Sequence, residues 1–363
     1  MSDPRTEDPA GLRLEPLAQW LLSQGLIADE TVDLRPALLA GGRSNISYRL
    51  APPGRDWVLR RPPLGHVLPS AHDMGREYRV QRGLASVGFP VPSPVAECAD
   101  PDVIGAPFYL MDFVDGRVVA SAGGAQALGA AGAHQACASL VDTLARLHDV
   151  DLADAGLTDF AKAGGYLPRQ AARWARQWEL TRTQEAAAVD ALRDAVTAAI
   201  DALPAGTGST TLVHGDYRYD NVILAPDSDG VVAVLDWEMS TLGDPVVDLA
   251  VLLVYWTEAA DVLRSRVPVA QHITDAPGMW DRAAIVERYA AASGRPLDHL
   301  DVCTALACFK LAVIMESIRY RALTGQQLGT GAAEADLMGA ATLALAELGL
   351  AVLREGTLTG LSS

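Results

Sequence analysis

Short runs of alternating hydrophobic and polar residues occupy the first third of the chain and predict a small antiparallel sheet. Glycine and proline turns separate the five predicted strands, which cover residues 37–40, 46–50, 57–60, 95–98 and 107–113. Two helices accompany this sheet. One is amphipathic and covers residues 12–25, and the other starts at Ser70, which stands three residues before Asp73 in the spacing of a capping box, and runs to Leu84.

From His134 onward the hydrophobic positions recur at helical spacing, and one hairpin over residues 211–237, turning at 227–230, interrupts them. The predicted helices cover residues 136–148, 168–184, 187–203, 245–256, 281–292 and 301–323. Residues 120–133 are rich in alanine and glycine, which predicts a loose surface connection.

A last apolar stretch covers residues 337–353. It contains Glu347 and is shorter than the roughly 20 residues that a membrane span needs, so we interpret it as a buried terminal helix. The whole pattern predicts an α+β protein. Residues 1–114 form a β-rich lobe, residues 115–363 form a larger helical lobe, and a ligand cleft lies between the lobes.

Charge and cysteine content narrow the class of protein. The net charge of −16 argues against general binding to nucleic acid or to an anionic membrane. The four cysteines form no CxxC pair and have no neighbouring histidines at metal-ligand spacing, so we expect reduced, buried thiols. The polar N-terminus does not resemble a secretory signal, and we therefore expect a cytoplasmic protein.

The candidate chemistry lies in the hairpin region. Asp216 follows one predicted strand, Asn221 begins the next, and Asp236 ends the third. Phosphoryl transfer uses such groups: one carboxylate orients and deprotonates the attacking hydroxyl, while an amide oxygen and a second carboxylate hold Mg²⁺. The alternative is a polar hairpin with incidental acids.

The run His214-Gly215-Asp216, with Asn221 and the pair Asp236-Trp237 after it, resembles the signature of the aminoglycoside phosphotransferase and choline kinase superfamily. This resemblance implies a two-lobed protein-kinase-like fold and an ATP- and Mg²⁺-dependent small-molecule kinase. By the resemblance Asp216 is the catalytic base, and Asn221 and Asp236 are the metal ligands. Asp248 resembles the buried acid of the family that braces the catalytic loop.

The resemblance also implies three nucleotide-binding parts in the first lobe. The turn that covers the phosphates would contain Gly42, Arg43, Ser44 and Asn45. The strand cation is usually lysine, yet no lysine precedes Lys162, so Arg60 is the candidate, with Arg61 as the fallback. The helix acid that fixes this cation would be Glu77, unless Glu77 is simply an exposed helical residue.

Adenine would lie between a strand and the link that joins the lobes. Val58 shares a strand face with Arg60 and would pack on the base, with Met111 behind it. Backbone groups of Asp112 and Val114 would bond to the base.

The acceptor is suggested by a finer resemblance to kinase-like domains associated with acyl-CoA dehydrogenases. The similar segments are residues 58–63, 68–72, 76–80, 166–170 and the run HGDYRYDN. This resemblance implies a hydroxyacyl-CoA substrate and a functional link to an acyl-CoA dehydrogenase. A large anion would suit the basic side chains Arg169, Arg173 and Arg176, which share a helix face; Arg218 and Glu238 complete the candidate acceptor set.

Three alternatives remain open at this point. The arginine face could be solvated above buried tryptophans and bind nothing. The acceptor could be an aminoglycoside or another antibiotic, which the acidic balance would favour. The chain could also be a nucleotide-binding regulator without catalysis, a reading that the replacement of the strand lysine by Arg60 suggests. The sequence does not decide between ATP and GTP or give the oligomeric state.

Overall fold

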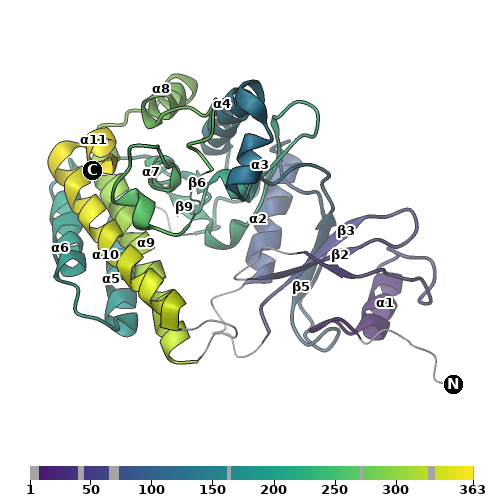
Figure 1. The fold of residues 1–363 in the computed structure, drawn as a ribbon. Helices are drawn as coiled ribbons and strands as arrows, with labels where there is room; N and C mark the ends of the chain where they lie inside the picture. Colours follow the sequence, from purple (N-terminus) through teal and green to yellow (C-terminus); the bar gives the residue numbers. More distant parts are fainter. Residues whose placement is uncertain are drawn as a thin grey trace. The chain divides into compact units, whose positions relative to one another are not determined.

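The computed structural model describes residues 8–39, 45–64, 73–161, 165–269, 273–325 and 332–362. It divides into two compact units, which are described separately below. The first unit contains Met1–Asp115 and Ala233–Glu238, and the second contains Gly116–Val232 and Met239–Ser363. Strands dominate the first unit and helices the second, so the predicted α+β class is confirmed (Figure 1).

The first unit is built on one antiparallel sheet in which β5 is inserted between β3 and β4, in the order β1-β2-β3-β5-β4. The register places Val58 opposite Met111 and Arg60 opposite Tyr109. The strands are β1 (Ala37–Leu38), β2 (Ile46–Leu50), β3 (Trp57–Arg61), β4 (Pro94–Cys98) and β5 (Phe108–Asp112). The five strands were all predicted, with β1 shorter than expected.

Two helices cover this sheet. Helix α1 (Leu14–Ser23) packs its apolar face on the core, with Trp20 edge-on to Phe108 at 5.0 Å between ring centroids. Helix α2 (Met74–Ser86) begins after Asp73, whose side chain accepts from the N–H of Arg76. The predicted start of this helix at Ser70 is therefore wrong: Asp73 is itself the N-cap, and Ser70 lies outside the described residues.

The second unit is a helical body. Its long helices are α4 (Gly129–His148), α5 (Tyr166–Thr181), α6 (Ala187–Asp201), α7 (Val246–Tyr255), α8 (Arg282–Ser293), α9 (Leu300–Leu323) and α10 (Ala332–Glu355). The short helices are α3 (Ala122–Gln126), capped by Ser121, and α11 (Thr357–Leu361). The loose connection predicted over residues 120–133 is wrong, because α3 and the first turn of α4 occupy it; alanine-rich composition favours a helix once one face is buried.

Helix α10 is the one described helix that is long and apolar enough, by length and composition, to cross a membrane. It packs along α9 and buries Met338, Leu345, Leu348 and Val352 (Figure 1). The prediction of a buried helix over residues 337–353 is confirmed.

Two short β-ribbons hold the segment that contains Asp216 and Asn221. Strand β6 (Thr211–Val213) pairs with β9 (Thr241–Gly243), and β7 (Val222–Leu224) pairs with β8 (Val231–Val234). The predicted turn at residues 227–230 is confirmed. However, β6 pairs with a strand beyond the hairpin, so both ends of the polar loop 214–221 are held by separate ribbons.

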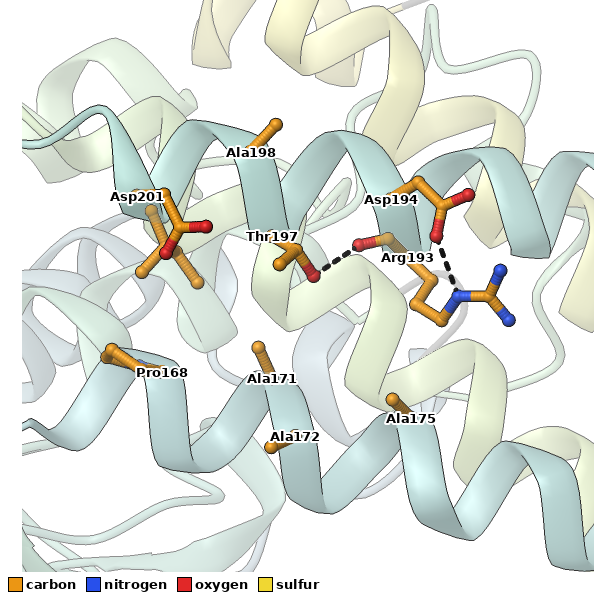
Figure 2. A pocket seen from close by; sticks show the side chains of 10 residues that line it. Pro168, Ala171, Ala172, Ala175, Arg193, Asp194, Thr197, Ala198 and Asp201 are labelled. Carbon is orange, nitrogen blue, oxygen red and sulfur yellow. Dashed lines mark hydrogen bonds and ion pairs between the residues drawn. The ribbon is translucent and has the colours of Figure 1, made fainter.

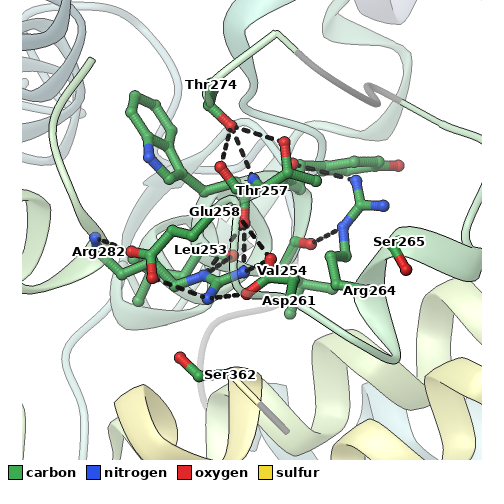
Figure 3. Close-up of polar contacts among 12 residues, drawn as sticks. Leu253, Val254, Thr257, Glu258, Asp261, Arg264, Ser265, Thr274, Arg282 and Ser362 are labelled. Atoms are coloured by element: carbon green, nitrogen blue, oxygen red, sulfur yellow. Dashed lines mark hydrogen bonds and ion pairs between the residues drawn. The ribbon is translucent and has the colours of Figure 1, made fainter. Parts of the chain in front are cut away.

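Buried arginines fix the chain after α7. Arg264 is 1% exposed and donates to the carbonyls of Val254 and Tyr255 at the end of that helix. Arg282 is also buried and pairs with Asp261 (Figure 3). Helix C-termini leave carbonyls without partners, and cationic donors there are favourable. The network therefore sets the position of Tyr255, a neighbour of the site.

Candidate active site

The loop that contains Asp216 is fixed by a buried acid. Asp248, in the first turn of α7, accepts from the backbone N–H groups of His214 at 2.6 Å and Gly215 at 2.7 Å. Gly215 has φ 84, and a Cβ atom there would lie 2.6 Å from the carbonyl oxygen of Met239. Only glycine suits this backbone. The bracing role predicted for Asp248 is seen directly in these bonds.

A second layer holds Asp248. Its Oδ2 atom lies 3.3 Å from Nε2 of His148, and Nδ1 of that ring bonds the Tyr289 hydroxyl at 2.7 Å. Burial alone would raise the pKa of Asp248, but the bond to His148 and the N–H of Gly215 outweigh burial and lower it. His148 and Tyr289 were not predicted, since nothing in the nearby sequence marks either residue as a partner of Asp248.

Within the loop, the side chains of Asp216 and Asn221 meet. Nδ2 of Asn221 lies 3.2 Å from Oδ2 of Asp216, and Nε of Arg218 lies 3.2 Å from the same oxygen. Arg218 also pairs with Asp220 and stacks on the Tyr255 ring, 4.9 Å from its centroid. One oxygen of Asp216 is therefore held by two donors. The other, Oδ1, has no hydrogen-bond partner among the described residues of its unit.

Asp236 belongs to the first unit and has a left-handed backbone, with φ 64. An aspartate in this region is strained, and such strain concentrates at functional sites. Its Oδ1 atom lies 2.5 Å from the guanidinium of Arg60. Its Oδ2 atom has no hydrogen-bond partner among the described residues of that unit.

Arg60 lies at the centre of a buried polar cluster in the first unit. It pairs with Glu77 at 2.9 Å, and Glu77 accepts from Asn45 at 2.7 Å and from the Tyr109 hydroxyl at 3.0 Å. Burial alone would lower the pKa of Arg60, but the carboxylates of Glu77 and Asp236 outweigh burial and raise it. Glu77 is 1% exposed, which excludes the alternative of an exposed helical glutamate.

Arg61, the fallback cation, points elsewhere. Its guanidinium donates to the carbonyl oxygens of Gly11, Pro62 and Ile104, all in its own unit. Of the two neighbouring arginines, Arg60 is therefore the one placed beside the predicted helix acid.

The predicted adenine-binding residues are partly brought together. Val58 and Met111 are cross-strand partners in one apolar cluster with Met74. The N–H of Asp112 donates to the carbonyl of Ser93 at 2.8 Å. The bond to a base therefore stays a prediction for the carbonyl group of Asp112 and for the backbone of Val114. Val114 follows, half-buried. Gly42, Arg43 and Ser44 lie outside the described residues.

The predicted metal ligands have the chemistry for Mg²⁺. Asn221 uses Nδ2 for its side-chain hydrogen bonds, to the carbonyl and Oδ2 of Asp216, so its amide oxygen has no partner among the described residues of its unit. Oδ2 of Asp236 likewise has no hydrogen-bond partner among the described residues of the first unit. Carboxylate and amide oxygens are hard ligands of the kind that Mg²⁺ prefers, so these residues fit the ion.

A different buried group also has metal-ligand side chains. Asp244, His299 and Cys303 place their ligand atoms within 4.8 Å of one another. However, Nε2 of His299 bonds Oδ2 of Asp244 at 2.7 Å, and Oδ1 of Asp244 accepts from the N–H of Val246 at the start of α7. These groups satisfy one another, so we interpret them as structural. All four cysteines are buried and free, as predicted.

The acceptor candidates are only partly gathered. Arg169, Arg173 and Arg176 are exposed along α5, above the buried Trp174 and Trp178. Arg173 stacks on the Trp174 ring, with 5.2 Å to its centroid. Of the five acceptor candidates, the structure joins Arg218 directly to Asp216.

Glu238 accepts from Asn45 at 3.2 Å in the first unit. It therefore contributes to the polar cluster around Arg60 and Glu77.

A hollow of about 390 Å³ lies between α5 and α6. Figure 2 shows its walls, with Ala171 and Ala175 of α5 on the side of Thr197 of α6. None of the predicted site residues lines it, and the side chains that do are mostly small and uncharged. We assign it no role in the chemistry.

We expect Arg60→Ala to raise the nucleotide KM about tenfold or more, because hydrogen bonds to charged groups contribute about 1.5–3 kcal/mol. The matched control is Arg61→Ala, whose guanidinium bonds to backbone carbonyls of its own unit. Steady-state kinetics with varied nucleotide tests the pair. A rise in KM for Arg61→Ala alone would show that the wrong arginine was assigned.

If Asn221 and Asp236 hold Mg²⁺ as predicted, Mg²⁺ should raise the nucleotide affinity of the wild type, and Asp236→Ala should abolish that increase, a loss of about 10- to 100-fold. Isothermal titration with nucleotide, with Mg²⁺ and with EDTA, measures this increase. If the variant responds to Mg²⁺ as the wild type does, Asp236 is not a metal ligand.

Known proteins resemble this chain in sequence and in structure. Residues 37–301 match the model of the phosphotransferase enzyme family. Acyl-CoA dehydrogenase family member 11 from Rattus norvegicus is 34% identical over 338 residues, which cover 91% of this chain and 42% of that protein. The chain spans 28% to 42% of the length of the curated relatives it matches.

Two solved structures illustrate the structural likeness. A candidate aminoglycoside phosphotransferase from Ralstonia eutropha is 32% identical, with a TM-score of 0.75, and the match covers 93% of this chain and 97% of that one. Aminoglycoside phosphotransferase APH(4)-Ia, solved with AMP-PNP and hygromycin B, is 16% identical with a TM-score of 0.58, over 90% of this chain and 98% of that one. The predicted kinase-like fold is confirmed.

Proposed function

We propose a reaction on the premise that this chain belongs to the phosphotransferase enzyme family and is a small-molecule phosphotransferase. In this proposal the chain moves the γ-phosphate of ATP to a hydroxyl group of a hydroxyacyl-CoA. The main support is the hydrogen bonding of the two carboxylate oxygens of Asp216. Two donors hold Oδ2, while Oδ1 has no partner among the described residues of its unit. A general base needs such an oriented oxygen within reach of the hydroxyl proton.

The chain's own residues would divide the work as follows. Asp216 accepts the proton of the acceptor hydroxyl while that oxygen forms the new bond to the γ-phosphorus and the bond to the β–γ bridging oxygen breaks, releasing ADP. Arg60, fixed by Glu77, binds phosphate oxygens of the nucleotide. Asn221 and Asp236 would hold Mg²⁺, which when bound offsets the negative charge of the phosphates.

The nucleotide assignment has support from distant relatives of the same fold. One aminoglycoside phosphotransferase was solved with AMP-PNP and another with GDP. Such complexes support a nucleotide cofactor for this chain. ATP and Mg²⁺ are our proposal within that support.

The hydroxyacyl-CoA assignment rests on the relatives and on charge. The curated relatives are named as acyl-CoA dehydrogenases, and this chain aligns with only part of each. The chain would therefore act on an intermediate that an acyl-CoA dehydrogenase also handles, in the cytoplasm. The exposed arginines of α5 and Arg218 beside Asp216 suit an anionic acceptor.

Phosphorylation of an aminoglycoside is the second candidate. It is favoured because the similar Ralstonia eutropha protein is named as a candidate aminoglycoside phosphotransferase. A catalytically silent regulator is a third reading. The orientation of Asp216 by Asn221 and Arg218 argues against it, since a silent protein has no need of an oriented base.

One experiment separates these functions. The protein is incubated with ATP and Mg²⁺ and a panel of hydroxyacyl-CoAs and aminoglycosides, and products heavier by one phosphate are sought by mass spectrometry. We expect ATP-dependent products from hydroxyacyl-CoAs alone. Phosphorylated antibiotics without phosphorylated acyl-CoAs would overturn the proposal in favour of the second candidate, and no product from any acceptor would favour the regulator.

A further inference from the structure

Lys310 is a buried cation without a role in the function proposed above. The chain contains two lysines, Lys162 and Lys310, beside many arginines. Lys310 lies on α9 between Phe309 and Leu311, both buried, and is itself 6% exposed. Burying an ammonium group in an apolar helix face costs free energy unless the group is paired. The position of Lys310 therefore calls for a specific partner.

Its partner is the backbone of the catalytic loop. The Nζ atom donates to the carbonyl oxygen of Gly215, the residue before Asp216. The N–H of Gly215 is bound to Asp248 at 2.7 Å. Both backbone polar groups of Gly215 are thus held, its N–H by Asp248 of α7 and its carbonyl oxygen by Lys310 of α9.

The ammonium group has two more hydrogens. Gly215 is its one hydrogen-bond acceptor among the described residues of the second unit, and the other neighbour is the face of Trp174, with 6.0 Å from Nζ to the ring centroid. A lysine ammonium donates up to three hydrogen bonds. Two donors are therefore left over, in a nearly dry place beside the proposed base.

The charges around Lys310 are mixed. Burial lowers its pKa, the carboxylates of Asp216 and Asp248 act in the opposite direction, and the nearby guanidinium groups of Arg173 and Arg218 lower it further. Arg173 and Arg218 thus lie near Lys310, and Arg218 also pairs with Asp216, in a chain whose net charge is −16. A concentration of positive charge at this position favours an acceptor that brings oxygen atoms with negative or partly negative charge.

We propose that Lys310 is a specificity-determining residue, whose ammonium group, anchored on the Gly215 carbonyl, donates to a carbonyl or anionic oxygen of the acceptor next to the hydroxyl that Asp216 deprotonates. The inference rests on the proposed function and narrows its substrate class. The preferred acceptors are alcohols with such an oxygen a few bonds from the hydroxyl, as in a hydroxyacyl thioester. Acceptors with an ammonium group in that place are disfavoured, because two cations would meet in a site with little water.

The test removes, in turn, the carbonyl oxygen of the acceptor and the ammonium group of Lys310. 4-Hydroxybutyryl-CoA is compared with its thioether analogue, which lacks the carbonyl oxygen, on the wild type and on Lys310→Met. We expect the wild type to prefer the thioester by about 10- to 100-fold in kcat/KM and in Kd, since hydrogen bonds to charged groups are strong. In Lys310→Met the preference should fall to about threefold or less. Arg354→Met removes an exposed cation of the same unit and should keep the wild-type preference.

The outcomes separate this inference from the proposed function. Affinities are measured by titration calorimetry without nucleotide, so they do not depend on turnover. If the wild type shows the preference in binding but phosphorylates neither compound, the proposed function fails and the role of Lys310 stands. If the wild type binds both alike or neither, or if Lys310→Met weakens both by one common factor, the inference fails, and Lys310 only supports the loop. The wild-type comparison remains decisive even if Lys310→Met does not fold.

Discussion

Asp216→Asn should lower kcat for phosphoryl transfer about 10³-fold, in the range that general bases contribute. The amide keeps the size of the carboxylate and can still accept a bond from Arg218 or Asn221 at one oxygen. It cannot take the proton of the acceptor hydroxyl. Since Arg60 and Glu77 belong to the other unit of the chain, nucleotide binding should be nearly unchanged.

Single-turnover kinetics with a hydroxyacyl-CoA, together with nucleotide titration, measures the two effects separately. The matched control is Asp227→Asn, an exposed acid in the turn between β7 and β8, which should keep wild-type turnover. An Asp216→Asn enzyme with normal turnover would show that another group accepts the proton. A loss of nucleotide affinity equal to the loss of kcat would point to a role in binding.

Local sequence predicted the parts of the site that local structure builds. Asp216 and Asn221 are five residues apart, and one loop between two short ribbons suffices to join them. The strand register of Arg60 followed from side-chain alternation and from the proline pair that ends β3. These features depend on neighbours in the chain, so a single sequence specifies them.

Features that depend on distant parts of the chain escaped prediction. His148 reaches Asp248 across 100 positions, and Tyr289 lies 141 positions beyond His148. Lys310 reaches Gly215 across 95 positions from a helix that is buried on nearly every side. Hydrophobic periodicity identifies the helices but does not say which polar residue of one faces a loop from another. The pairing of β6 with β9 was missed for the same reason.

Asp248 is the point where these long-range contacts converge. It is fully buried, and it accepts two backbone N–H groups of the catalytic loop while it faces His148. A carboxylate with so many donors is stabilised in its charged form. Removal of the Asp248 carboxylate would leave the buried N–H groups of His214 and Gly215, and Nε2 of His148, without this hydrogen-bond partner. We therefore expect the loss of Asp248 to lower the free energy of unfolding first of all, and catalysis only as a consequence.

Asp248→Ala should lower the free energy of unfolding by about 3–5 kcal/mol, the usual cost of breaking a buried charge network by removing one partner. Urea unfolding followed by circular dichroism measures it. Asp248→Asn, which keeps one acceptor oxygen, should lose less and serves if the alanine variant does not fold. Asp336→Ala, with an 82% exposed side chain, is the surface control and should unfold as the wild type does.

The pH dependence gives the same prediction a second readout. The folded-state pKa of Asp248 is depressed, so its stabilisation is complete above the ordinary carboxyl pKa of about 4 and is lost as the pH falls through the lower folded value. The wild type should therefore lose stability below about pH 4 more steeply than Asp248→Asn, which has no such carboxyl to protonate. Equal slopes for the two proteins in that range would mean that Asp248 contributes nothing as a carboxylate, and the loop would then depend on its other contacts, chiefly that of Lys310 with the Gly215 carbonyl.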